Sequence, residues 1–481
     1  MAGIFKAYDI RGIVGTALNE KTAYLIGRGL ATEVFDSQSP IVVSRDMRTH
    51  SPELAQQLAQ GLADGGCNVV DIGLAATPMN YWANNHYNAK GSVQVTASHN
   101  GPQYNGFKVS GEGGAPFDYA TGLDKVEKYV EAHEREDELP APVEDIGKID
   151  VVNDSLKNYL DWMDTFVVEY SNSPKLKIGI DTANGMGGFF LTDFFARHPQ
   201  LELVPLYFEL DGNFPNHEAD PLVEENLRDV QQLVRENGCD FGVAFDGDAD
   251  RCMFVDENGQ NISSDLITAL IGGEMLINNQ DGAILYDLRS SRVVPEYIAQ
   301  NGGRAVRGRV GHSFMKRLLK KENARFGGEL SGHYYFQDCF NTDSGLMAMI
   351  QILNLWRKSN QNIDTSSTRS SSQTTMSQTA LSQTTMSQLV APLRKYYATG
   401  EINFKVRDAK TTQAQIEDFY AKVDGAKLDH LDGLTVEFAD WWFNLRSSNT
   451  EPLLRLNLEA NSEAERERHL SQVRALIEGV S

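Results

Sequence analysis

Short apolar runs alternate with longer amphipathic stretches along most of this chain, and this alternation restricts its fold more than any other feature. Residues 40–44 form an apolar run typical of a buried strand, residues 51–65 carry leucines at helical spacing after a Ser-Pro start, and residues 67–73 form another apolar run. Strands that alternate with helices build α/β units. The sequence therefore predicts α/β domains with largely parallel or mixed sheets.

The same rhythm returns later in the chain. Residues 176–181, 239–245 and 283–287 are strand-like, and residues 185–188 open a helix. A chain of 481 residues is long enough for three or four domains of about 100–200 residues each. The predicted units are three α/β domains at residues 1–150, 151–256 and 257–363, an insertion at 364–388, and a small α+β domain at 389–481.

The insertion consists almost entirely of Ser, Thr and Gln, and the sequence SQTTMSQ occurs in it twice, at residues 372–378 and 382–388. Such a composition can bury little apolar surface, so we expect a flexible surface segment. A phosphorylated Ser/Thr tract is the alternative interpretation.

The composition restricts the class of function. A net charge of −22 argues against a nucleic-acid scaffold and against an anchor on anionic lipid. Charged residues interrupt the N-terminal residues, so we expect no signal peptide, and no run approaches the ~20 apolar residues that span a bilayer. None of the four cysteines stands at CxxC spacing, so we expect no structural zinc. We expect a cytoplasmic enzyme, monomeric or dimeric, with no nucleic-acid or membrane partner.

A first loop with candidate chemistry follows the strand-like residues 91–95 and reads TASHN, with Ser98 at its centre. A strand that ends in small polar residues can deliver an exposed side chain into a cleft. A serine hydroxyl becomes a good nucleophile only beside a base or a metal, and His99 and Lys108 are candidate neighbours. Taken alone, this loop is more typical of a plain turn.

A second loop, residues 246–251, reads DGDADR after an apolar strand. In extended geometry the carboxylates of Asp246, Asp248 and Asp250 point the same way and can converge on one hard cation. Carboxylate ligands suit Mg²⁺, and Arg251 offers a phosphate a bidentate fork. A calcium EF-hand also begins D-x-D-x-D, but its sixth position requires Gly, where this chain has Arg251.

Two further loops combine polar groups with small residues. Residues 327–333 (GGELSGH) place Glu329, Ser331 and His333 among glycines, so that the carboxylate can accept hydrogen bonds from sugar hydroxyls. Residues 446–450 (RSSNT) offer a guanidinium, hydroxyls and an amide, which suit a phosphate. A plain turn and a helix N-cap cluster are the respective structural alternatives.

Together these loops resemble the α-D-phosphohexomutases, most closely the bacterial phosphomannomutase/phosphoglucomutase group. The resemblance covers nearly the whole chain, in the family's order. The segments that carry it are FKAYDIRG at residues 5–12, TASHN at 96–100, DGNFP at 211–215, DGDADR at 246–251, GHS at 311–313, GELSGH at 328–333 and RSSNT at 446–450.

The resemblance implies a heart-shaped architecture in which three related α/β domains with mixed sheets and a C-terminal α+β domain surround a central cleft. It implies that Ser98 carries a phosphoryl group, and that Asp246, Asp248 and Asp250 hold Mg²⁺ together with an oxygen of that group. The implied reaction moves a phosphate between the 1- and 6-positions of a hexose phosphate. It passes through a hexose 1,6-bisphosphate, which also serves as activator.

The same resemblance implies roles for single residues. Arg251 would stabilise the phosphoryl group in flight, while Lys108, Arg11 and His333 are candidates for proton handling, among which the sequence does not choose. The residues implied in substrate binding are Tyr8, Arg289, His312, Glu329, Ser331, His333, Arg446, Ser448, Asn449 and Thr450.

The details of the loops favour mannose and glucose phosphates as substrates. The glucosamine-phosphate branch of the family usually has Gln where this chain has Leu330. If Glu329 binds the 3- and 4-hydroxyls, the protein does not distinguish the configuration at C2, and both mannose and glucose phosphates fit. Phosphoglucosamine mutase and a phosphatase with an aspartyl nucleophile remain alternatives. One departure is Gly101 before Pro102, where the family normally has Pro directly after TASHN, which predicts a looser loop.

Overall fold

The first sheet is organised around strand β2 (Pro40–Arg45), in which Ile41, Val42 and Val43 are all buried. Ile41 and Val43 face one hydrophobic core, and Val42 faces another. A strand that is apolar on both faces must be covered on both, which is the arrangement of α/β units. The predicted strand over residues 40–44 is confirmed.

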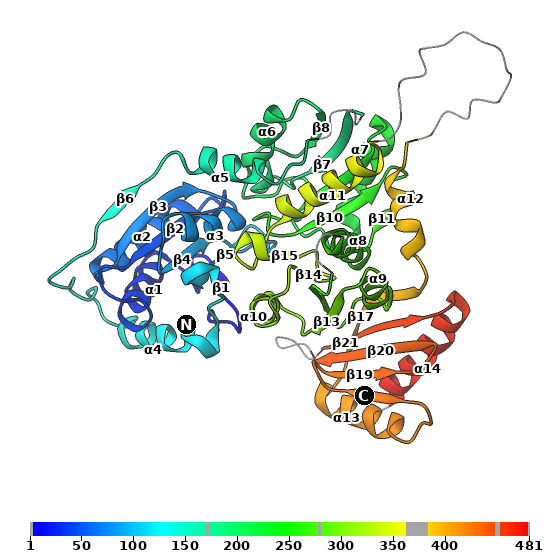
Figure 1. Cartoon of the computed structure of the whole chain (residues 1–481). Coiled ribbons are helices and arrows are strands. Elements are labelled where there is room, and N and C mark those ends of the chain that lie inside the picture. Colours follow the sequence, from blue (N-terminus) through cyan, green and yellow to red (C-terminus); the bar gives the residue numbers. More distant parts are fainter. Residues whose placement is uncertain (1–2, 170–173, 278–279, 362–382, 448–452, 480–481) are drawn as a thin grey trace, which may run out of the picture.

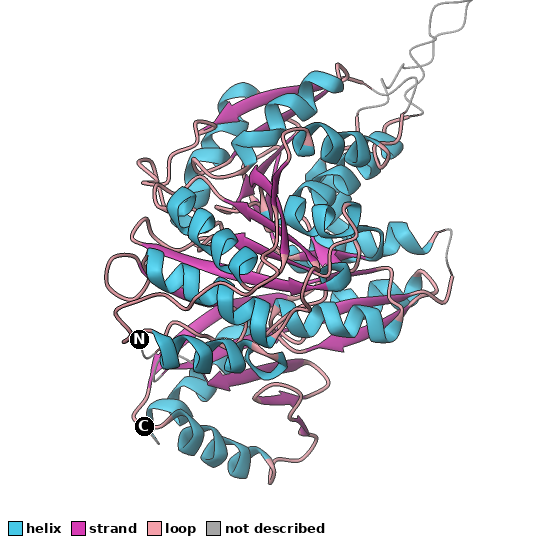
Figure 2. Cartoon of the chain, turned by 90° about the vertical axis from the view of Figure 1, so that its left-hand side faces the viewer, coloured by secondary structure: helices cyan, strands magenta, loops and turns pink. Residues whose placement is uncertain are grey.

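The computed structural model describes residues 3–169, 174–277, 280–361, 383–447 and 453–479, and the statements below refer to these residues. They form four sheet-containing units (Figure 1), and helices lie on both sides of the strand layers (Figure 2). Mixed sheets in the first three units and an antiparallel sheet in the fourth confirm the predicted fold class. No helix in the described ranges is both long and apolar enough to cross a membrane.

The first unit is a six-stranded mixed sheet with the order β1-β5-β4-β2-β3-β6. Helices α1, α2 and α4 share one core with it, and α3 contributes to the core of the next unit. Its other elements are β1 (Ile10–Ile13), α1 (Glu20–Glu33), α2 (Ser51–Asp64), β3 (Asn68–Leu74), α3 (Thr77–His86), β4 (Gly91–Val95), β5 (Tyr104–Gly111), α4 (Leu123–His133) and β6 (Ile149–Val151).

The second unit is a five-stranded sheet with the order β11-β10-β9-β7-β8. The short strand β11 pairs with β10 and lies beyond residue 256, so the second sheet extends past the domain boundary expected there. Its elements are α5 (Ser155–Asp164), β7 (Leu176–Asp181), α6 (Gly187–Arg197), β8 (Leu201–Leu206), α7 (Arg228–Asn237), β9 (Phe241–Phe245), β10 (Cys252–Asp256) and β11 (Asn261–Ile262).

The third unit repeats the pattern with the order β13-β12-β14-β15-β16. The strands predicted at residues 176–181 and 283–287 coincide with β7 and β12. Its elements are α8 (Ser264–Leu276), β12 (Ala283–Asp287), α9 (Val293–Gln300), β13 (Arg304–Gly308), α10 (His312–Glu322), β14 (Phe326–Gly328), β15 (Tyr334–Phe336), β16 (Thr342–Asp343) and α11 (Gly345–Ser359).

The end of the Ser/Thr/Gln segment is ordered, contrary to the expectation for residues 364–388. Helix α12 (Met386–Val390) begins after Thr385, whose side chain accepts a hydrogen bond from the Gln388 amide in a capping box. Met386 is fully buried, and the Ser387 amide donates to Glu257 at 3.0 Å. Residues 362–382 lie outside the described residues.

The fourth unit is an antiparallel sheet with the order β17-β21-β20-β19-β18. Helices α13 (Ala409–Tyr420) and α14 (Glu463–Gly479) share a single core with the sheet. Alternate residues of its strands therefore face away from that core. The strands are β17 (Tyr397–Lys405), β18 (Lys427–Asp429), β19 (Leu434–Glu437), β20 (Trp441–Ser447) and β21 (Leu453–Ala460).

Helices α1 and α2 touch through two glycines. An added Cβ on Gly61 would lie 2.1 Å from the Tyr24 carbonyl oxygen, and one on Gly27 would lie 2.3 Å from the Leu58 carbonyl oxygen. Since backbone atoms cannot move aside cheaply, we predict that Gly61→Ala destabilises the protein by about 1–3 kcal/mol, despite the better helix propensity of Ala. Thermal unfolding measures this loss.

Gly479→Ala at the exposed end of α14 is the matched control, because no atom lies within 4 Å of the added Cβ. Equal melting temperatures for Gly61→Ala and wild type would show that the two helices do not pack as closely as described.

Candidate active site

The three acidic residues of the second unit follow the carboxyl end of β9. The sequence predicts that Asp246, Asp248 and Asp250 converge through extended geometry, but the segment is a tight turn, in which Ala249 has a φ of +60°. One carboxylate oxygen of each nevertheless lies within 4.8 Å of the others, and all three residues are buried. The turn, and not strand alternation, brings these carboxylates together.

Cationic and polar groups from two units surround the carboxylates. Lys108 of β5 donates to Asp248 at 2.7 Å and to Asp250 at 2.5 Å, while Arg251 Nε donates to Asp246 at 3.0 Å. These cations are needed because three buried carboxylates would otherwise repel one another. The Thr77 hydroxyl at the start of α3 adds a 2.5 Å hydrogen bond to Asp248.

The surroundings shift the pKa of Asp246 in one direction and the pKa values of Asp248 and Asp250 in the other. Burial, together with the charge of Asp250, raises the pKa of Asp246 well above its ordinary value. Burial also acts on Asp248 and Asp250, but Lys108 outweighs it and holds the pKa of both below the ordinary value. The same ion pairs raise the pKa of Lys108, although its burial acts in the opposite direction.

The three-aspartate group fits a hard divalent cation. Within the described residues, the buried Oδ1 atoms of Asp248 and Asp250 have no hydrogen-bond partner. Buried carboxylate oxygens without a donor are costly unless they bind a cation, and an all-oxygen donor set suits Mg²⁺.

Ser98 lies beside this group. Its hydroxyl donates to Asp246 Oδ2 at 2.9 Å and lies 3.3 Å from Nδ1 of His99. The sequence predicts an exposed serine, whereas Ser98 is only 4% exposed, with a φ of +51°. The DGDADR turn covers this loop. Gly247 lies so close that an added Cβ would be 2.4 Å from the Ser98 carbonyl oxygen, which shows that the two loops touch directly.

A buried arginine that sequence analysis missed holds this loop. The Arg48 guanidinium donates to the carbonyl oxygens of Ser98 at 2.8 Å, Asn100 at 2.5 Å, Gly101 at 2.8 Å and Tyr104 at 3.1 Å. The loop is therefore not loosened by the glycine before proline. The sequence could have indicated Arg48 by its position, because it follows a buried strand closely, as Ser98 and Asp246 do.

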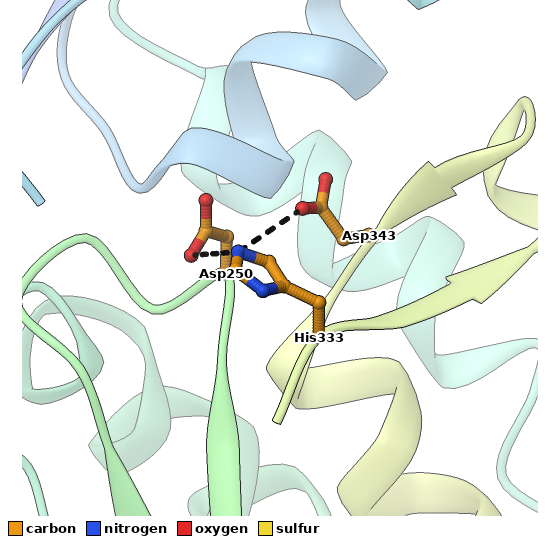
Figure 3. A group of neighbouring side chains, drawn as sticks. All are labelled: Asp250, His333 and Asp343. Carbon is orange, nitrogen blue, oxygen red and sulfur yellow. Dashed lines mark ion pairs between the residues drawn. The ribbon is translucent and has the colours of Figure 1, made fainter. Parts of the chain in front are cut away.

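His333 bridges two carboxylates near the aspartate group. Its Nε2 lies 3.6 Å from Asp250 and 3.7 Å from Asp343 (Figure 3). Burial and the nearby charges of Arg251 and His312 lower the pKa of His333 well below its ordinary value, so the ring is neutral. These three residues could also hold a cation, but imidazole is a poorer ligand for Mg²⁺ than carboxylate.

The loop of residues 328–333 is held firmly from several sides. Glu329 accepts hydrogen bonds from the Gly311 amide at 2.7 Å and from the Tyr335 hydroxyl, while the Ser331 hydroxyl lies 3.0 Å from His333 Nδ1. Burial, reinforced by the charge of Asp287, raises the pKa of Glu329 to about 7.

The candidates of the first unit approach the same region. Arg11 donates to the Asn100 side chain of the Ser98 loop and forms an ion pair with Asp9 at 2.5 Å. The ring of Tyr8 lies 5.8 Å from the ring of His312, which in turn lies 6.3 Å from that of His333. A row of rings therefore connects the N-terminal segment to the aspartate group.

The predicted phosphate-binding residues lie on the third and fourth units. Arg289 forms an ion pair with Asp287 at 2.7 Å, and Arg446 donates to Glu401 at 3.2 Å. Ser448, Asn449 and Thr450 lie outside the described residues. The described elements on either side are strand β20, which ends at Ser447, and strand β21, which begins at Leu453.

A pocket of about 600 Å³ joins the first, third and fourth units. The lining residues are Phe5, Lys6, Ala7, Tyr8, Arg309, Val310, Gly311, Asp432, Arg446, Ser447 and Arg455. Tyr8 and Arg446 are the predicted substrate-binding residues among them. Ser98 and the three aspartates do not line this pocket. The row of rings runs from Tyr8, which lines the pocket, through His312 to His333 beside the aspartate group.

Comparisons with known proteins agree with this geometry. Models of the phosphoglucomutase/phosphomannomutase family match the chain as α/β/α domain I over residues 2–137, domain II over 157–259, domain III over 263–372, and the C-terminal domain over 401–476. The chain belongs to the phosphoglucomutase/phosphomannomutase family. It is accordingly an isomerase of the phosphohexomutase type.

Relatives cover nearly the full length of the chain. A protein named phosphohexose mutases from Xanthomonas campestris is 36% identical over 96% of this chain and 95% of its own. A phosphomannomutase from Vibrio cholerae is 36% identical over 95% of this chain and 94% of its own. The crystal structure of a family protein from Burkholderia thailandensis matches with a TM-score of 0.83 and 31% identity, over 99% of this chain and 97% of that one.

We predict that Arg48→Met destabilises the protein by about 3–5 kcal/mol, because it leaves the buried Asp46 carboxylate without its cation and four carbonyls without their donor. Denaturant unfolding measures the loss. Arg45→Met, at the partly exposed end of strand β2 that precedes Arg48, is the control and should change stability by less than ~0.5 kcal/mol. Equal losses for both variants would contradict the role given to Arg48.

We predict that Glu329→Gln removes a pH dependence of stability. Folded Glu329, with a pKa of about 7, keeps its proton at pH values above 4.5 where the unfolded side chain has lost it. The wild type therefore loses stability as pH rises from 4.5 to 7, by about 3 kcal/mol, and the variant does not. Unfolding both proteins at pH 4.5 and 8 measures the difference. Parallel pH profiles would refute the shifted pKa.

Proposed function

We propose that this chain interconverts the 1- and 6-phosphates of glucose and mannose, with Ser98 as the phosphoryl carrier. The observation that carries the proposal is the Ser98 hydroxyl, which lies 2.9 Å from Asp246 within a group of three buried aspartates. The turn between β9 and β10 and the loop after β4 touch directly, so a phosphoryl group on Ser98 would lie against the proposed cation ligands.

Asp246, Asp248 and Asp250 would hold Mg²⁺ with an oxygen of the phosphoserine. When bound, the ion would neutralise the carboxylates and draw charge from the phosphoryl oxygens. Lys108 and Arg251 already contact the aspartates and would stabilise the charge on the phosphoryl group as it leaves Ser98. Phosphoryl transfer needs little else from a protein than positioning and charge stabilisation.

In the forward step the bond between phosphorus and Ser98 Oγ breaks, a bond forms from phosphorus to a hydroxyl oxygen of the hexose phosphate, and Ser98 Oγ takes up a proton as it leaves. The hydroxyl proton must go to a base. Of the three candidates, His333 is supported best, because its Nε2 lies 3.6 Å from Asp250 and 3.7 Å from Asp343, whose charges would stabilise the ring once it has accepted the proton. Lys108 is held protonated by its ion pairs with Asp248 and Asp250, and the Arg11 guanidinium is engaged by Asp9 and the Asn100 side chain.

The product of this step is a hexose 1,6-bisphosphate. After it turns in the cleft, its other phosphate returns to Ser98, which restores the carrier and releases the isomerised sugar phosphate. Added hexose 1,6-bisphosphate would phosphorylate Ser98 again in a chain that has lost its phosphoryl group. Arg446 and the segment 448–450 would hold the non-reacting phosphate, and Glu329 and Ser331 would bind sugar hydroxyls. Further contacts to the substrate would come from Arg289, His312 and Tyr8.

Intact mass tests the carrier directly. We predict a fraction of the purified chain that is about 80 Da heavier, the mass of one phosphoryl group, with the modification on Ser98. Glucose 1-phosphate with Mg²⁺ and a trace of the 1,6-bisphosphate should yield glucose 6-phosphate, and mannose 1-phosphate should react likewise. Ser98→Ala should lower turnover by at least about a thousandfold.

Ser110→Ala is the matched control, since Ser110 is a buried serine of the same sheet outside the loop. Full activity in Ser98→Ala, with free phosphate as product and a phospho-aspartate in the DGDADR turn, would instead establish a phosphatase. A clear preference for glucosamine 6-phosphate would move the substrate to an amino sugar.

A further inference from the structure

The DGNFP segment lies in a long irregular loop, residues 207–223, that follows strand β8. Two side-chain contacts fasten this loop to the turn after β7. The Asn216 side chain donates to the Asn184 side chain at 2.7 Å. His217 Nε2 lies 3.0 Å from a carboxylate oxygen of Asp181, which is buried. Hydrogen bonds to side chains therefore give the loop a defined course without regular secondary structure of its own.

The middle of the loop lies against Arg48, the buried arginine that holds the Ser98 loop. The guanidinium carbon of Arg48 lies 5.0 Å from the centre of the Phe214 ring, and a cation is attracted to the face of an aromatic ring. An added Cβ on Gly212 would lie 2.6 Å from the Arg48 Cα atom, so the two backbones touch. The loop therefore supports Arg48 from the side of the second unit.

The end of the loop reaches Arg251 through Asp220. The Oδ1 atom of Asp220 accepts a hydrogen bond from Arg251 Nη1 at 3.3 Å and another from the Leu222 amide at 3.2 Å. The second bond comes from the backbone of the loop and fixes the direction of the carboxylate. The preceding residue, Ala219, is buried and lies close to Gly247 of the DGDADR turn. Asp220 is therefore held in place on both sides of its own position in the chain.

The three nitrogen atoms of the Arg251 guanidinium differ in their partners. Nε donates to Asp246 Oδ2 at 3.0 Å, and the Ser98 hydroxyl donates to the same oxygen at 2.9 Å. Nη1 donates to Asp220. Among the residues that the structure describes, the buried Nη2 atom has no acceptor, which is unfavourable unless an acceptor binds there. Because a guanidinium is a rigid plane, two anchored nitrogens determine where the third one points.

We propose that Asp220 is a positioning residue, which sets the Arg251 guanidinium so that Nη2 faces the phosphoryl group carried by Ser98. This inference rests on the proposed function, in which Ser98 carries that group and Arg251 stabilises it. The DGNFP loop thereby serves the reaction on both sides, since Phe214 supports Arg48 behind the Ser98 loop and Asp220 orients Arg251. Asp220 acts through Arg251 and needs no contact with the sugar.

Asp220→Ala tests the proposal through kinetics. We expect kcat with glucose 1-phosphate to fall about ten- to a hundredfold, because a displacement of ~1 Å in a positioned group can cost about a hundredfold in rate. KM should change less than about threefold, because Arg251 faces a phosphoryl group that belongs to the protein and not to the incoming sugar phosphate. A kcat within about twofold of wild type would overturn the proposal.

Two further variants separate positioning from a loss of charge. Asn keeps an oxygen that can accept from Arg251 and from the Leu222 amide, so Asp220→Asn should retain at least about a third of the wild-type kcat. Glu225 lies in the adjoining 3₁₀-helix Glu224–Leu227 with a side chain that is 64% exposed, so Glu225→Ala removes the same charge nearby and should leave kcat unchanged. Thermal unfolding checks that each variant remains folded. An Asp220→Asn variant as slow as Asp220→Ala would show a charge effect and overturn the positioning role.

A double-mutant cycle with Arg251→Lys shows whether Asp220 acts through Arg251. Lysine keeps the positive charge beside the aspartates but has no rigid fork to be oriented. In the Arg251→Lys background, Asp220→Ala should lower kcat by less than about threefold further. Losses that multiply in full would mean that the two residues act independently, which would overturn the proposal.

Crystal structures of wild type and Asp220→Ala, grown under the same conditions, provide a measurement that does not depend on turnover. We expect the Arg251 guanidinium to leave its wild-type position or to occupy more than one position in the variant. A guanidinium in the single wild-type position would overturn the inference, even if the mutase reaction is established. A displaced guanidinium in a chain that converts neither sugar phosphate would support the orienting contact and reject the proposed function instead.

Discussion

The burial of three carboxylates within 4.8 Å of one another is the constraint on which the rest of this structure depends. Asp246, Asp248 and Asp250 cannot be ionised together in a protein interior without cations. The second unit supplies Arg251 itself, but Lys108 comes from the first unit. The site is therefore complete only when separate units of the chain meet.

The packing follows from that requirement. The Thr77 hydroxyl and amide at the start of α3 both bond to Asp248, and Gly247 lets the turn touch the Ser98 loop. Arg251 pairs with His333 in an isolated β-bridge, which connects the second unit to the third. Each contact lies at the carboxyl end of a strand, where loops of α/β sheets gather and form binding sites. The position of the site is thus a consequence of the topology.

Local patterns in the sequence predict the strands well, because buried parallel strands are continuous apolar runs; β7 and β12 have the predicted bounds. The sequence also indicates which loops carry acidic and hydroxyl groups. It does not indicate long-range contacts. Arg48, in the loop after β2, reaches the Ser98 loop, and the burial of Ser98 depends on a turn of another unit. Residues 383–388 are ordered through Glu257, which no local composition reveals.

The proposed mechanism requires that the three aspartates and Ser98 together hold one divalent cation. Anomalous diffraction from crystals grown with Mn²⁺, which can replace Mg²⁺ at oxygen ligands, tests it most directly. We expect one strong peak within about 2.2 Å of oxygens from Asp246, Asp248 and Asp250, adjacent to Ser98. A peak at the Asp250–His333–Asp343 group instead, or no peak with Lys108 still paired to the aspartates, would contradict it.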